Sequence, residues 1–197
     1  MAFKPQNSPE GYSAELDLFR TTPTDVGIES IEYSDCRPTT QVGQNQNAIE
    51  FSISGSSMKY ISLQQTKLQL SIRLEKGDGQ DITAADNVGL VNLPLQTLFS
   101  TVDLELNQVP TTHIGNNYGY KAYLDTLLNY GQDAKFSQLQ SQLYYPDTPE
   151  HFNSTDVRGG LNFGLMWRTG FAENSKIIDL EGNLFLDLAQ QDRKSVV

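Results

Sequence analysis

Hydrophobic and polar residues alternate along several stretches of the chain, and the clearest stretch runs from Thr66 to Glu75. In an extended chain, successive side chains point to opposite sides, so one side of this stretch carries only apolar residues, namely Leu68, Leu70, Ile72 and Leu74. The pattern predicts a β-strand with one buried face. Alternation at residues 102–107 and 178–188 predicts two more such strands, and shorter runs at 49–54 and 59–63 predict another pair.

Glycines mark two positions within this strand pattern. Gly77 and Gly79 flank Asp78 directly after the first strand, where glycine can adopt the positive φ that a tight turn needs, so a turn is predicted here. Gly182 lies inside the third strand and predicts a bulge or a close approach of another segment.

One segment follows a helical rather than a strand period. Its apolar residues recur at i, i+3, i+4, i+7 and i+8, at Tyr120, Tyr123, Leu124, Leu127 and Leu128. Asn116 or Asn117 can cap its start, and Gly131 can end it. The spacing predicts an amphipathic helix with these residues facing inward. A short helical turn at 133–143 is predicted to follow, with Phe136, Leu139 and Leu143 inward.

These elements together predict an all-β fold. Several strands and one inserted helix or helical hairpin near residues 117–143 favour an antiparallel sandwich, because too few helices are available for the crossovers of a parallel sheet. Residues 1–14 are polar and contain Pro5, Pro9 and Gly11, so they predict a flexible N-terminal arm. Residues 15–197 are then expected to form a single domain.

The charge and cysteine content disfavour several function classes. With 24 acidic and 14 basic residues, the chain has a net charge of −10, which disfavours direct contact with nucleic acid. A single cysteine, Cys36, allows neither an internal disulfide nor a cysteine-cluster zinc site. No run approaches 18 consecutive apolar residues, so no membrane span is expected.

Residues suited to catalysis are sparse. The two histidines, His113 and His151, are 38 positions apart, and no Gly-x-Ser-x-Gly motif or phosphate-binding loop is present. We therefore predict no enzyme activity, no cofactor and no metal site. Trp167 is predicted to be a packing anchor. The remaining aromatic cluster is expected in the core or at a subunit interface rather than as a stacking platform for sugars or bases; it comprises Tyr118, Tyr120, Tyr123, Tyr130, Tyr144 and Tyr145.

Three runs of sequence carry a resemblance to a known family. They are LFSTVDLELN at 98–107, NYGYKAYLDTLLNYG at 117–131 and AKFSQL at 134–139. They resemble the hexon-type major capsid proteins of Polinton/Maverick elements and adintoviruses, including virus-derived homologues in invertebrate genomes. Supporting matches are ELDLF at 15–19, IEFSISG at 49–55, YYPDT at 144–148 and QDR at 191–193, while Gly119 replaces a commoner proline.

The resemblance implies a fold and a role. The family fold is a double jelly roll, of which residues 15–197 would form the first sandwich, without its closing strand or strands and without the second jelly roll. The implied function is a structural, hexon-like capsid subunit that self-associates into an icosahedral shell, in a truncated or domesticated form. The implied partners are copies of itself, as trimers in the family, and other capsid proteins, with no direct nucleic acid contact.

The resemblance also implies a location and a packing or interface helix. The location is the virion, after assembly in the cytoplasm or nucleus of a host cell. The motif helix comprises Tyr118, Tyr120, Tyr123, Leu124, Leu127, Leu128, Tyr130 and Gly131.

Two other function classes are open to a sandwich fold. A jelly-roll carbohydrate-binding module would use exposed tyrosine and tryptophan side chains to stack on sugars. A cupin-type enzyme would need two or three histidine ligands at strand spacing, which two distant histidines do not supply.

Overall fold

The computed structural model describes residues 29–40, 48–56, 58–112 and 115–190. The chain divides into two compact units, residues 1–56 and 57–197. In the described part of the first unit, the backbone N–H of Thr39 donates to the carbonyl of Glu50 at 2.7 Å, and no helix or strand is present there. The strand predicted at 49–54 is therefore wrong, and the predicted arm at 1–14 lies outside the described residues.

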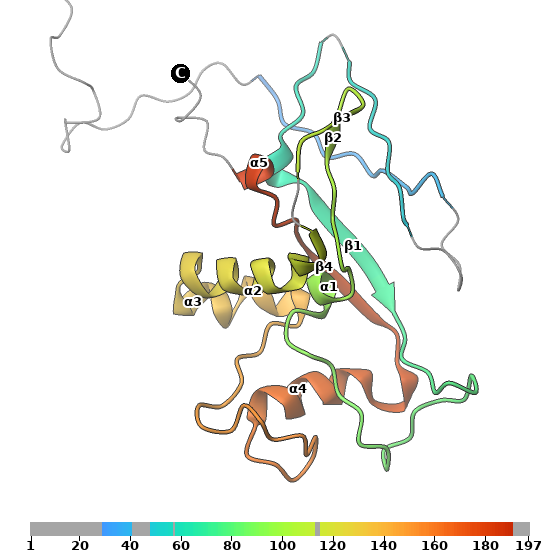
Figure 1. Ribbon diagram of the computed structural model, residues 1–197, viewed down its shortest axis with the longest axis vertical. Helices are drawn as coiled ribbons and strands as arrows, with labels where there is room; N and C mark the ends of the chain where they lie inside the picture. Colours follow the sequence, from blue (N-terminus) through green and yellow to red (C-terminus); the bar gives the residue numbers. More distant parts are fainter. Residues whose placement is uncertain (1–28, 41–47, 57, 113–114, 191–197) are drawn as a thin grey trace, which may run out of the picture. The chain divides into compact units, whose positions relative to one another are not determined.

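The second unit is organised around two antiparallel strands, β1 (Lys67–Ile72) and β4 (Ile178–Asn183), which run side by side in Figure 1. Leu70 lies opposite Leu180, and Leu68 lies opposite Gly182. Exposure alternates along β1, with the leucines on the more buried side, as the sequence period requires. The strand prediction at 66–75 is confirmed for residues 67–72, and the prediction at 178–188 is confirmed for residues 178–183.

A small hairpin forms the other sheet. Strands β2 (Glu105–Leu106) and β3 (Val109–Pro110) are joined by Asn107 and Gln108, both with positive φ, at 51° and 65°. Two central residues with positive φ are the requirement of a tight hairpin turn. The strand predicted at 102–107 is thus present only at its end.

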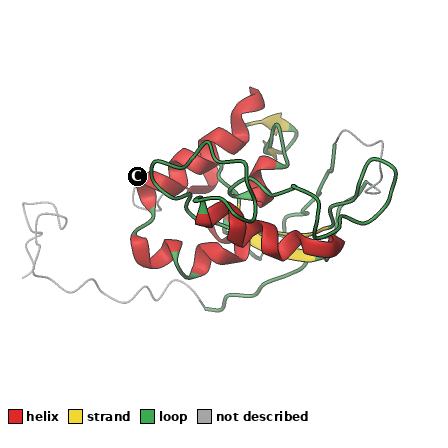
Figure 2. Ribbon diagram, turned by 90° about the horizontal axis from the view of Figure 1, so that it is seen from below, coloured by secondary structure: helices red, strands yellow, loops and turns green. Residues whose placement is uncertain are grey.

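Helical segments make up much of the rest of this unit. They are the 3₁₀ turns η2 (Leu63–Gln65), η3 (Gly115–Asn117), η4 (Gln138–Gln142) and η5 (Glu173–Ser175), and the α-helices α1 (Pro94–Thr97), α2 (Tyr118–Asn129), α3 (Gln132–Lys135), α4 (Phe163–Ala172) and α5 (Asp187–Gln190). The helix and the following helical turn predicted near 117–143 are confirmed as α2, α3 and η4. Leu139 and Leu143 are buried as predicted, whereas Phe136, also predicted to face inward, is exposed. Figure 2 shows how little strand accompanies these helices.

The predicted all-β, antiparallel jelly-roll sandwich is wrong. In the described residues there are two sheets of two strands each, and neither is backed by the other. Two segments expected to be extended lead into helical structure instead. The run at 59–63 leads into η2, and residues 184–188 lead into α5. Without these strands a sandwich has no second layer.

The main core lies on the apolar side of the β1–β4 sheet. Leucines of β1 pack against buried residues from four segments distant in sequence, namely Leu90, Leu95, Leu143, Ala172, Ile178 and Leu180. Gly182 is a position of close approach, because a Cβ atom there would lie 2.2 Å from Cδ of Gln142. The close-approach prediction for this glycine is confirmed.

Candidate functional site

Helix α2 exposes its wide apolar face. Tyr120, Leu124 and Leu128 are 77%, 56% and 81% exposed, and Leu127 beside them is also exposed. Residues four apart lie above one another on a helix, so these four side chains form one continuous stripe, here called the α2 row. The sequence predicted this stripe to face inward, and the structure overturns that prediction.

The opposite face of α2 anchors the helix. Tyr118, Ala122 and Thr126, again four apart, are buried. The Tyr118 hydroxyl accepts a hydrogen bond from the backbone N–H of Phe185 at 3.2 Å, and burial raises the pKa of this phenol. The Thr126 hydroxyl donates to the carbonyl of Ala122 at 2.8 Å. A narrow face of small and aromatic residues therefore holds α2, which leaves the leucines free for another contact.

Lys121 fixes the orientation of α2 relative to the end of the described chain. Its Nζ lies 2.7 Å from Oδ2 of Asp125 and 2.8 Å from Oδ1 of Asp187 in α5. Partial burial lowers the pKa of this ammonium, but the hydrogen bonds to the two carboxylates outweigh burial and raise it above its ordinary value. Lys121 therefore links α2 to α5 through ion pairs with Asp125 and Asp187.

The other residues of the predicted motif helix are less exposed than the α2 row. Tyr123 and Tyr130 pack partly buried against a cluster of Leu93, Leu139 and Tyr144. Gly131 is exposed and precedes α3 rather than simply ending α2. Of the six tyrosines expected in the core or at an interface, five are buried or half-buried and only Tyr120 is exposed.

Helix α4 carries a second exposed row of apolar side chains, which the sequence did not predict. Phe163, Trp167 and Phe171 lie four apart on one face and are between 44% and 63% exposed. We call these three residues the α4 row. Trp167 is thus not the packing anchor that the sequence predicted. Phe171 also contacts the ring of Tyr145, with the ring centroids 5.8 Å apart.

The inner side of α4 is held by a buried arginine. Arg168 is 3% exposed, and its Nε donates to the carbonyl of Leu90 at 2.9 Å. One terminal nitrogen donates to the carbonyl of Tyr145, and the other lies 2.7 Å from Oδ1 of Asp147. All three nitrogens are therefore paired, and Arg168 serves to fix α4 on the core.

One signal for α4 was available in the sequence. Asn162 is the N-cap residue of the helix, and its side-chain oxygen accepts a hydrogen bond from the backbone N–H of Leu165 at 3.3 Å. An asparagine before a run of ten residues without proline is a helix-start signal. Gly164 and Gly170 within that run obscured it.

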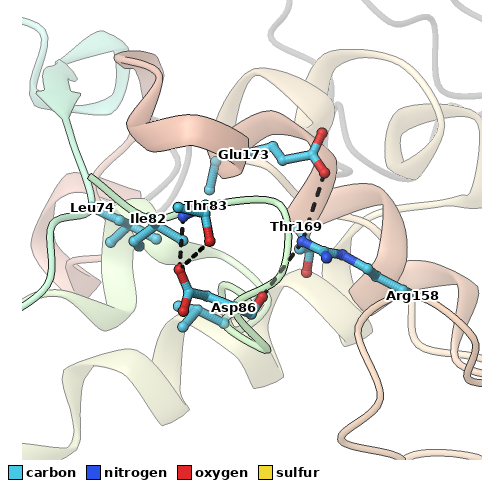
Figure 3. Close-up of a pocket in the computed structure, with 9 residues that line it drawn as sticks. Leu74, Ile82, Thr83, Asp86, Arg158, Thr169 and Glu173 are labelled. Atoms are coloured by element: carbon cyan, nitrogen blue, oxygen red, sulfur yellow. Dashed lines mark hydrogen bonds and ion pairs between the residues drawn. The ribbon is translucent and has the colours of Figure 1, made fainter. Parts of the chain in front are cut away.

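A shallow hollow of about 10 Å³ lies beside α4 (Figure 3). This volume is far below the roughly 300–1,000 Å³ of most ligand pockets. Asp86 in its wall accepts from the backbone and side chain of Thr83 at 2.7 and 2.8 Å, and pairs with Lys76 at 2.8 Å. Arg158 reaches the carboxylate of Glu173 at 3.7 Å. The charged groups around the hollow therefore satisfy one another.

The other candidate groups give no further site. His151 is half-buried, with its backbone N–H bonded to the carbonyl of Thr148 at 3.1 Å, and His113 lies outside the described residues. In the described ranges, no three residues of the metal-binding types histidine, cysteine, aspartate and glutamate cluster to hold an ion. Nor does any helix there have the length and apolar character to cross a membrane.

The chain has a distant relative in a nematode. It is 25% identical over 157 residues to an uncharacterized protein of Caenorhabditis elegans, in an alignment that covers 76% of this chain and 35% of that protein. The chain thus spans about a third of the length of this relative. No protein-family model and no solved structure matches the chain.

Proposed function

We propose that this chain is a structural capsid protein, a hexon-like major capsid subunit that self-associates into an icosahedral shell, and that the α2 row contacts a neighbouring copy. The observation that carries the proposal is the exposure of Tyr120, Leu124 and Leu128 on the helix that bears the capsid-type motif. The proposal concerns self-association and does not include a jelly roll.

The energetics of the α2 row support a protein contact. Burying a leucine side chain fully is worth about 1.5–3 kcal/mol. Leu124 and Leu128 remain more than half exposed, so much of this stabilisation is not gained within one chain. Contiguous apolar patches of this kind mark interaction surfaces in soluble proteins. Repeated copies of one such contact are what a closed shell requires.

The proposed partners and location follow from the same assignment. The partners are copies of this chain and other capsid proteins, and the location is the virion after assembly inside a host cell. The formal net charge of −10 supports contacts among proteins rather than with the phosphate backbone of a genome.

The test compares two sets of exposed leucines. The mass of the full chain is measured by light scattering over a wide concentration range, with electron microscopy of the particles. We expect the mass to exceed that of one chain, and Leu124→Ser with Leu128→Ser to weaken association at least tenfold. Leu98→Ser is the matched control, because Leu98 is also about half exposed but lies at the end of α1.

Two results would contradict the proposal. One is a wild-type chain that stays a single copy at every concentration; the other is association that the double substitution leaves unchanged. Millimolar or tighter binding on a glycan array, lost in Trp167→Ala, would instead assign carbohydrate binding to the α4 row.

A further inference from the structure

The two outer edges of the β1–β4 sheet differ. The β4 edge is covered, because the Ser141 hydroxyl of η4 donates to the carbonyl of Glu181 at 2.8 Å. The side-chain Nε2 of Gln96 in α1 donates to the carbonyl of Asn183 at 3.3 Å. Side chains from two helical segments therefore occupy the place where a further strand would bind.

These contacts reveal which backbone groups of β1 point outward. In an antiparallel pair, the N–H and C=O of one residue point to the same side, and the sides alternate along the strand. Since the carbonyls of Glu181 and Asn183 point away from β1, the residues opposite them in β1 point away from β4. Gln69 lies opposite Glu181, so the backbone groups of Gln69 and, two residues on, Ser71 face the outer edge of β1.

At Gln69 and Ser71, the outer edge of β1 has no covering contact in the part of the chain that the structure describes. There, the sheet contains β1 and β4 alone, and no residue bonds to the backbone of Gln69 or Ser71 at the outer edge. An isolated two-stranded sheet is marginal in water, and packing against helices, as here, or further strands stabilise it. Unpaired edges are templates for strand addition.

Charges beside this edge do not oppose a further strand. Natural edge strands often carry lysine or arginine to repel a partner. Here the cations on the polar face are neutralised within the chain: Lys67 Nζ lies 2.7 Å from Glu181, and Arg73 lies 2.5 Å from Asp81 and 3.3 Å from Glu75. The two cations next to the edge are therefore paired with carboxylates, which outnumber them, and no unpaired lysine or arginine there repels a partner strand.

We propose that β1 pairs with β1 of a second copy of this chain, antiparallel and with Gln69 opposite Gln69, to form a four-stranded sheet across a two-fold axis. The occupant is a second copy because β1 is complementary to itself in this register. Leu68 then lies opposite Leu70 of the partner strand on the apolar face, and Lys67 lies opposite Ser71 on the polar face.

The neighbouring registers fit less well. Shifting by two residues one way centres the pair on Leu70 and places Lys67 opposite Arg73, two like charges. Shifting the other way centres it on Leu68 and places Leu70 opposite Thr66. A shift by an odd number would bring the apolar face of one strand onto the polar face of the other.

The register gives a direct cross-linking test in the full chain with Cys36→Ser, which removes the exposed native thiol. Residues directly opposite in a hydrogen-bonded antiparallel pair have Cα atoms about 5.5 Å apart, within disulfide range. Gln69→Cys should therefore give a covalent dimer on mild oxidation. Ser71→Cys is the matched control, because its two copies would be about 13 Å apart along the strands.

A second variant tests the same contact without a thiol. Gln69→Pro removes an outward N–H from each copy at the two-fold axis and is tolerated at a strand edge. Losing two hydrogen bonds should raise the dissociation constant of this dimer roughly 5- to 150-fold. Light scattering or analytical ultracentrifugation measures this change.

The outcomes separate this contact from the α2 row. The pairing is supported if the Gln69→Cys chain cross-links and the Ser71→Cys chain does not, and if adding Leu124→Ser with Leu128→Ser leaves the Gln69→Cys cross-link intact. It is overturned if the Gln69→Cys chain stays monomeric on oxidation while Gln69→Pro leaves association unchanged. A mixture of the two cysteine variants in which only mixed dimers form would overturn the Gln69 register.

Discussion

Replacing Gly182 by alanine should destabilise the second unit, because another side chain already fills the space. A Cβ at this position would lie 2.2 Å from Cδ and 2.4 Å from Cγ of Gln142. Carbon atoms pack best about 3.5–4.0 Å apart, so Gln142 would have to withdraw by more than an ångström. Gln142 is buried, and its Oε1 accepts a hydrogen bond from Nε2 of Gln96 at 2.6 Å.

Three contributions set the size of the effect. Overpacking a core position costs about 1–3 kcal/mol. Leaving one of the two N–H groups of the buried Gln96 amide without its acceptor costs about 1–3 kcal/mol more. The smaller conformational freedom of unfolded alanine offsets at most about 1 kcal/mol of this. We therefore expect Gly182→Ala to lower the free energy of unfolding by about 3 kcal/mol, which corresponds to roughly 6–12 °C in Tm for a chain of this size.

Urea unfolding followed by circular dichroism, together with thermal melts, measures this change. Gly170→Ala is the matched control: nothing lies within 4 Å of a Cβ there, and alanine in a helix interior should stabilise by about 0.5–1 kcal/mol. Adding Gln142→Ala to Gly182→Ala removes the clash, so the double variant should lose less than the sum of the single variants. A Gly182→Ala chain that unfolds at the wild-type urea concentration would refute this reasoning.

Three further predictions concern anchoring contacts. Hydrogen bonds from Lys76 and then from Thr83 lower the pKa of Asp86 from its ordinary 3.8 to about 2. The ionised Asp86 therefore stabilises the fold above about pH 3.8, and this stabilisation is lost as the pH falls toward 2. Asp86→Asn should flatten the pH dependence of the free energy of unfolding between these two pH values. Ala122→Leu should cost about 1–3 kcal/mol of stability in urea, because Ala122 is fully buried under α2. Asp147→Ala should cost about 3–5 kcal/mol in the same assay, because it leaves the buried Arg168 charge uncompensated, and an unchanged midpoint would contradict that role.

The sequence predicted those elements whose cause is local. The alternation from Leu68 to Leu74 is visible without knowledge of any partner, and it corresponds to β1. The leucine spacing likewise located α2. What periodicity could not supply was the identity of the strand or helix that each face would meet. The prediction of β1 is therefore correct, but the predicted sandwich is wrong, because the described residues do not contain the partner strands that it needs.

The facing of α2 illustrates the same limit. The sequence pattern identifies the most hydrophobic face of a helix, and it therefore predicted that the broad leucine stripe would be buried. The structure instead buries the face with Ala122, and a Cβ at the neighbouring Gly119 would lie only 3.3 Å from Cα of Thr97 in α1. Small residues allow two helices to approach closely, and this depends on shape rather than on apolar character. The candidate surface was consequently identified from the sequence but assigned to the wrong side.

During synthesis, β1 can pair with β4 only after the ribosome has made the long segment between them. Lys67 and its ion-pair partner Glu181 are 114 residues apart in the chain. At about 5–20 residues per second, a ribosome needs about 6–23 s to deliver β4 after β1 has been made. Through that interval β1 lacks its contact with β4, and native contacts so distant in sequence form slowly. A nascent chain of this kind depends on being shielded, by a chaperone or by its own intervening helices, until β4 arrives.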